Sequence, residues 1–369
     1  MTRPDSAAPV GPEHRTGSGD STVAYSPAHV SGAIGIASRK DPAVDTAFTL
    51  DPGRFVQHPG GHDGELRGAV EELQQGRWMA ARAVLAQSWG DWPVWTARTQ
   101  VLAAVASRTD VLNHWRAEAA GSVGLVTLLA RAAVDRALMA SAQPTDPRTV
   151  ARLEHSAREL CWDAAATLAD DPVPWICLLA LAQLDLSQAR PEHRVPAPDQ
   201  MLPPGPWGLL AQAQRADPWN REAFHRMLRV WLARGSSGTA SEFLAAFLPG
   251  APAGSPLHAL PLYVFVDRYR RAPLRNAAEL LWTKDERVRA AVLRAYENWR
   301  VAPGEQGRWP VVDESHLAHA LWAARRPVDA AEVFAVMSPF VSSQPWVSVG
   351  DRPDDLFRQA LAQSCAAGR

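Results

Sequence analysis

Lysine is nearly absent from this sequence of 369 residues. Lys40 and Lys284 are its two lysines, so arginine carries almost all of the positive charge. The 38 basic residues are balanced by 39 acidic ones, which leaves a formal net charge of −1. A chain without a cationic surplus has no long-range field that attracts phosphate-rich partners. We therefore expect neither nucleic acid nor a membrane surface among its partners.

Cysteine and long apolar runs are also scarce. Cys161, Cys177 and Cys365 form no CxxC pair, and an odd number of thiols argues against a disulfide framework. The N-terminal residues lack the basic-then-apolar order of a secretory signal, and no run approaches the roughly 18 apolar residues that a membrane helix needs. These absences predict a cytoplasmic protein.

The motifs of common chemistries are missing too. The sequence contains no GxxxxGKS/T phosphate loop, no GxGxxG dinucleotide motif, no GxSxG nucleophile elbow and no HExxH zinc motif. Each of these motifs holds a phosphate, a nucleophile or a metal at a defined spacing, so their absence removes the usual routes to catalysis. We expect no cofactor and no metal, and an enzyme is the less favoured class.

The dominant positive signal is helical periodicity. From Gly64 onward, apolar residues recur at spacings of three and four, which predicts an all-α fold. Residues 1–60 are rich in proline, glycine and serine without this period, so we expect a poorly ordered N-terminal extension. We expect helical arrays at residues 61–190 and 209–369, joined by a proline-rich connection at residues 191–208.

Three Asp-Pro pairs predict where helices start. Asp146-Pro147, Asp171-Pro172 and Asp217-Pro218 each place a capping carboxylate before a proline that suits the first helical position. The spacing of these pairs indicates stacked short helices.

The segment from Asp217 to Pro252 predicts a single helical hairpin that turns at residues 235–238. Its apolar, small and turn positions are Phe224, Met227, Leu228, Trp231, Gly235, Ala240, Phe243 and Pro252. This series resembles the tetratricopeptide repeat, with Leu228 in place of a small residue. The resemblance implies stacked helical hairpins whose first helices line a concave face that binds a protein or peptide.

Other segments resemble the same unit. The second copy contains Leu317, Ala318, Leu321, Ala330 and Phe334, and a partial copy contains Gly76, Trp78, Ala81 and Leu85. No period of about 34 residues runs through residues 90–215. The expected architecture is therefore an irregular α-solenoid.

Two polar clusters raise the question of a metal site. Glu222 and His225 have the ExxH spacing of di-metal helical bundles, but such sites need a second ExxH unit that is missing here. Asp313, Glu314, His316 and His319 gather four possible ligands in seven residues. The alternative for this second cluster is a helix N-terminus, where acidic residues meet the positive end of the helix dipole.

The candidate partner-binding residues lie mainly on the first helix of the 217–252 hairpin. Arg221, His225 and Arg229 recur at four-residue spacing, which predicts a basic stripe able to bind a carboxylate or an acidic segment. Asn220, Trp231 and Arg268 complete the candidate set, the last from a polar cluster beside Tyr263 and Tyr269. A solvated face with partners on a neighbouring helix is the alternative for both groups.

Three functional hypotheses follow. The favoured one is a non-catalytic interaction or scaffold protein that binds a protein or peptide on the concave face of its repeats. The alternative is an enzyme or small-molecule sensor with a ligand pocket between helices. A DNA-binding regulator is the weakest hypothesis, because no helix-turn-helix segment or basic surplus is present.

Overall fold

The computed structural model describes residues 55–272, 275–301 and 309–368, and every regular element in these ranges is a helix. The first ten α-helices are α1 (Gly64–Gln74), α2 (Met79–Ser88), α3 (Trp92–Ala106), α4 (Val111–Ala119), α5 (Val123–Ser141), α6 (Pro147–Thr167), α7 (Val173–Leu181), α8 (Trp207–Ala216), α9 (Arg221–Ala233) and α10 (Ser237–Phe247). The remaining seven are α11 (Leu260–Arg271), α12 (Arg275–Lys284), α13 (Glu286–Arg300), α14 (Val311–Ala323), α15 (Pro327–Met337), α16 (Trp346–Val349) and α17 (Pro353–Ala367). The predicted all-α class is confirmed.

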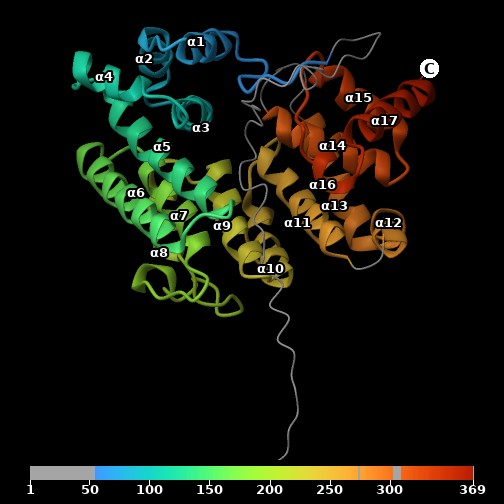
Figure 1. Ribbon diagram of the computed structural model, residues 1–369. Helices are drawn as coiled ribbons and strands as arrows, with labels where there is room; N and C mark the ends of the chain where they lie inside the picture. Colours follow the sequence, from blue (N-terminus) through green and yellow to red (C-terminus); the bar gives the residue numbers. More distant parts are fainter. Residues whose placement is uncertain (1–54, 273–274, 302–308, 369) are drawn as a thin grey trace, which may run out of the picture.

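The buried apolar residues form two clusters, which define two lobes. The N-terminal lobe comprises α1 to α10 and the C-terminal lobe comprises α11 to α17, on opposite sides of the molecule with α9 and α10 nearest the middle (Figure 1). Helix α11 contributes to both cores. Leu260 and Val264, four residues apart, belong to the first cluster, whereas Leu262 and Phe265 on another face belong to the second. The division of the core therefore falls at α11.

The proline-rich segment lies within the N-terminal lobe. Val195 and Gly205 exchange two backbone hydrogen bonds of 2.9 Å, which close the segment into a loop. Leu202 and Trp207 are buried in the N-terminal core, and the Trp207 indole donates to the Pro203 carbonyl oxygen. These contacts show that the segment is packed against the helices that it connects.

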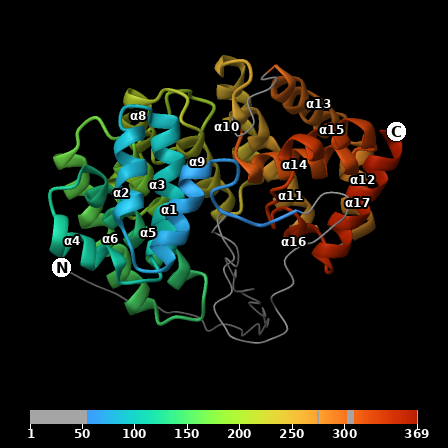
Figure 2. The ribbon, with the colours of Figure 1, turned by 90° about the horizontal axis from the view of Figure 1, so that it is seen from above.

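The predicted N-terminal extension falls largely on residues 1–54, outside the described residues. Its last residues pack against the C-terminal lobe. Phe55 is buried against Phe357, and Val56 exchanges backbone hydrogen bonds with Pro339 and Val341. The chain then crosses to α1 in the N-terminal lobe (Figure 2). Burial of the Phe55 ring explains why residues 55–60 are ordered although proline and glycine surround them.

The Asp-Pro pairs differ in what they cap. Asp146 caps α6, as expected, by accepting a hydrogen bond from the Thr149 N–H. Asp171 accepts from the Val173 N–H at the start of α7 and also from buried groups of α3 and α5. Asp217, however, lies at the end of α8, and Asn220 caps α9 instead. The prediction of a helix start at Asp217 is wrong because the Asp217 carboxylate accepts from the Trp219 N–H within the turn.

Three hairpins share the same turn. The helix pairs α1–α2, α9–α10 and α14–α15 each continue through one residue with positive φ, namely Gly76 at 81°, Gly235 at 75° and Arg325 at 62°. In all three turns, the N–H of that residue donates to the carbonyl three residues before it. The N–H of the next residue donates to the carbonyl five residues before itself. This is the Schellman pattern that closes a helix C-terminus. The three turns are therefore locally equivalent.

Close packing of α5 on α2 predicts opposite effects of alanine at two helical glycines. A Cβ at Gly124 would lie 2.5 Å from the Cδ1 atom of the buried Leu85, whereas a Cβ at Gly68 would meet nothing within 4 Å. We expect Gly124→Ala to lower the free energy of unfolding by about 1–3 kcal/mol through overpacking. Gly68→Ala should raise it by about 0.5–1 kcal/mol because alanine favours the helix. Urea denaturation measures both, and equal effects would contradict the close approach.

Candidate functional site

The predicted basic stripe on α9 lies in the interior, between the lobes. The Arg221 guanidinium donates through Nε to Asp313 Oδ2 at 2.8 Å, and its Nη2 contacts the other carboxylate oxygen and the Tyr263 hydroxyl. Arg221 belongs to α9, Tyr263 to α11 and Asp313 to α14, so this ion pair joins the two lobes. The sequence left two interpretations of the stripe, a binding surface or a face with partners on a neighbouring helix. For Arg221 the second is correct, because its partners lie on α11 and α14.

The neighbouring residue on α9 forms a second buried ion-pair group, within the N-terminal lobe. Glu222 accepts two hydrogen bonds from Arg131 on α5, at 2.8 and 2.9 Å, and two more from Arg226. Burial alone would raise the pKa of Glu222, but the two guanidinium groups lower it to about 2. Glu222 is therefore ionised and held by arginines. No group of three metal-ligating side chains lies together anywhere in the described part of the chain.

A stack of rings continues the interior polar region into the C-terminal lobe. The Tyr263 ring lies between His225, at a centroid distance of 4.9 Å, and His316, at 3.8 Å. Burial lowers the pKa of His316 to about 3, and burial followed by the charge of Arg221 lowers the pKa of His225. Both imidazoles are thus neutral near pH 7, which allows them to lie among arginines.

The acidic cluster at Asp313 marks the start of α14. Asp313 and Glu314 lie in the first turn, which confirms the helix N-terminus interpretation. Glu314 is only 2% exposed, and one carboxyl oxygen accepts a long hydrogen bond of 3.4 Å from the Trp299 indole while the other has no partner. Burial, reinforced by the nearby Asp313 charge, raises the pKa of Glu314 to about 8.

The other candidate residues do not form one surface. Asn220 is buried as the cap of α9 and donates to Thr96, and Trp231 is buried beside Trp207. Arg229 is half-buried, whereas Arg268 is exposed on α11. The structure therefore brings Arg221 and His225 together around Tyr263 and separates Arg268 from them.

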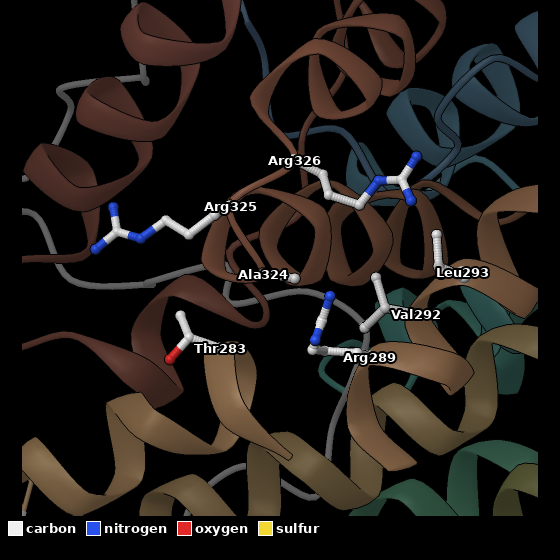
Figure 3. Close-up of a pocket in the computed structure, with 7 residues that line it drawn as sticks. All are labelled: Thr283, Arg289, Val292, Leu293, Ala324, Arg325 and Arg326. Atoms are coloured by element: carbon white, nitrogen blue, oxygen red, sulfur yellow. The ribbon is translucent and has the colours of Figure 1, made fainter. Parts of the chain in front are cut away.

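A hollow of about 420 Å³ lies in the C-terminal lobe, between α12–α13 and the turn that joins α14 to α15 (Figure 3). We call it the arginine pocket. Its lining comprises Thr283, Arg289, Val292, Leu293, Ala324, Arg325 and Arg326. Among the described residues, three cations and no acid thus line this hollow. A binding site for negatively charged groups requires this kind of lining.

The three arginines of the pocket differ in their own partners. Arg289 donates to Glu286 at 2.7 Å, in a pair whose members are both largely exposed. Arg326 pairs with Asp329 and lies 5.9 Å from the centre of the Tyr296 ring. Arg325 is exposed, and no carboxylate of the described residues pairs with its guanidinium. The exposed pair of Arg289 with Glu286 contributes little stability, so a ligand can compete for Arg289.

Arg325 occupies a position that the equivalent hairpins give to glycine. A non-glycine residue at a φ of 62° costs about 1 kcal/mol through the clash of its Cβ with the backbone. Arg325 is not among the residues predicted from the sequence, although alignment of the three hairpins places it opposite Gly76 and Gly235. That alignment is the signal that could have identified it.

No protein-family model, curated protein or solved structure matches this chain. Within the described residues, no helix combines the length and apolar character needed to cross a membrane.

The buried group around Glu222 predicts a large loss of stability on neutralisation. In Glu222→Gln, Arg131 and Arg226 keep their charges in a site that is nearly inaccessible to water. We expect the free energy of unfolding to fall by about 3–5 kcal/mol in urea denaturation. The matched control Glu159→Gln, at an exposed pair with His155, should change it by less than about 0.5 kcal/mol. Similar losses in the two variants would contradict the buried ion-pair group.

Glu314 predicts a pH-dependent gain of stability in Glu314→Gln. The folded chain holds the proton of Glu314 up to about pH 8, whereas the unfolded chain releases it near its ordinary pKa of 4.5. The wild-type chain therefore loses stability as pH rises through this window. We expect the variant to equal wild type near pH 4.5 and to exceed it by on the order of 3 kcal/mol at pH 7.5. Thermal or urea denaturation across this range measures the difference, and a difference independent of pH would contradict the assignment.

Proposed function

We propose that this protein is a non-catalytic interaction protein with tetratricopeptide-like hairpins that binds a polypeptide partner at the arginine pocket. The observation that carries the proposal is the pocket lining, in which the described residues comprise three arginines, apolar residues and a threonine but no acid. Such a lining offers both charge and apolar contact to a ligand, as protein-binding surfaces do.

The chemistry of the lining favours binding over catalysis. Arginine stays protonated at all physiological pH values, and threonine is a weak base, so the lining residues supply no group that could accept a proton. At the lobe junction, Asp313 accepts hydrogen bonds from Arg221 and Tyr263, and the His316 ring stacks on the Tyr263 ring. These features support a role in recognition for the pocket and a role in stability for the junction.

The repeat-like architecture also supports the proposal. Three hairpins close with the same turn, and arrays of hairpins present several helix ends on one side of a molecule. Here the partner site is proposed at a hairpin turn, whereas the sequence hypothesis placed it on the first helix of the 217–252 segment.

A small anionic molecule is the second candidate ligand. A hollow of about 420 Å³ falls within the range of small-molecule sites, and this volume is the observation that favours a sensor. The two candidates predict different bound material, which is a polypeptide for the interaction protein and a small anion for the sensor.

Affinity capture from an extract of the source cells distinguishes them. The full chain is compared with the double variant Arg289→Glu, Arg325→Glu, in which the pocket charge is inverted at two exposed positions. Arg352→Glu with Arg358→Glu, at exposed positions elsewhere in the same lobe, is the control for the change in net charge. We expect wild type and control to retain the same polypeptide. The pocket variant should lose at least about 90% of it, because a loss of 1.4 kcal/mol of binding free energy weakens affinity tenfold.

Mass spectrometry of the bound material gives the result. A polypeptide retained equally by all three chains would contradict binding at the pocket. Retention of a small anion in place of a polypeptide would transfer the proposal to the sensor candidate.

A further inference from the structure

The three guanidinium groups of the arginine pocket do not converge on one point (Figure 3). Arg325 and Arg326 leave the α14–α15 turn in opposite directions, and the Arg289 side chain stands on α13, across the pocket from Arg326 (Figure 3). Guanidinium groups that converge would bind one phosphate. Groups that are spread apart instead match several carboxylates at different positions of an extended segment.

The surface between the charges is apolar. Val292, Leu293 and Ala324 line the pocket together with the arginines. Nucleic acid presents a continuous row of phosphates and favours a surface with a cationic surplus, which this chain of net charge −1 lacks. A polypeptide that carries acidic side chains and an apolar side chain matches the mixed lining better.

Arg325 gives the most specific indication of a ligand. A Cβ added to Gly76 or Gly235, at the equivalent turns, would meet nothing within 4 Å, so packing does not dictate the residue at this position. Arginine at the third turn carries the backbone strain of a positive φ, and none of the described carboxylates pairs with it in return. Strain that yields no internal contact indicates a contact with something outside the chain.

From these observations we propose that the arginine pocket binds an extended acidic segment of a partner protein, and that Arg325 determines its specificity. The proposal rests on the proposed function and deepens it by naming the class of ligand. Because Arg289 and Arg326 have acids of their own, binding exchanges these internal pairs for contacts with the ligand. Arg325 gives up no pair with a described carboxylate when the ligand binds. Its contribution to affinity is therefore the largest of the three.

The test uses a fluorescein-labelled decapeptide of nine glutamates around one central leucine, measured by fluorescence anisotropy with the full chain at low salt. A peptide with glutamine in place of every glutamate controls for charge, and an RNA decamer controls for ligand class. Arg325→Gly is the informative variant because it removes the side chain and also relieves the positive φ. Gly235→Arg is the reciprocal control at the equivalent turn.

We expect the acidic peptide to bind wild type, and the glutamine peptide and RNA to bind at least tenfold more weakly. Arg325→Gly should weaken the acidic peptide about tenfold while its Tm rises by roughly 2 °C. Gly235→Arg should lower the Tm without changing affinity. A gain in stability combined with a loss of binding is a result that a purely structural role for Arg325 would not produce.

Three outcomes overturn the inference. The first is equal affinity of wild type and Arg325→Gly for the acidic peptide, and the second is binding of RNA as tight as that of the peptide. The third is no binding of the acidic peptide at all. If the capture experiment still returns a polypeptide that depends on the pocket, the proposed function stands and only the acidic ligand class fails.

Discussion

The arrangement of the two lobes depends on compensation of the charges that α9 carries into the interior. Arg221 and Glu222 are adjacent in sequence, yet Arg221 pairs with Asp313 of the C-terminal lobe and Glu222 with Arg131 of the N-terminal lobe. Removing the partner of a buried charge costs several kcal/mol, so both contacts must form together. This requirement sets the position of α14 relative to α5. Phe55 and the crossing segment before α1 then join the same lobes at a second place.

Local patterns in the sequence predicted what is local in the structure. The periodicity of residues 217–252 and the glycine at 235 predicted the α9–α10 hairpin and its turn, because helix faces and C-terminal caps depend on neighbours within one or two turns. The start of α9 was misplaced because Asp217 and Asn220 are both good capping residues, and local sequence does not tell which one will cap.

The candidate site depended on contacts that a single sequence does not contain. Four-residue spacing correctly placed Arg221 and His225 on one face of a helix, but it could not reveal that α11 and α14 cover that face. The arginine pocket was missed for the same reason, since Arg289 and Arg325 lie 36 positions apart and meet only when α13 packs beside the α14–α15 turn. Arg325 differs, because a comparison of the three turn positions in the sequence could have identified it.

We propose that recognition occurs at the arginine pocket, whereas the charged residues of α9 hold the fold together. Hydrogen–deuterium exchange of the full chain, with and without the acidic decapeptide, tests this division directly. We expect the peptide to slow exchange in residues 283–293 and 322–329 and to leave exchange in residues 220–231 unchanged. Slower exchange at residues 220–231, with no change around Arg325, would contradict it.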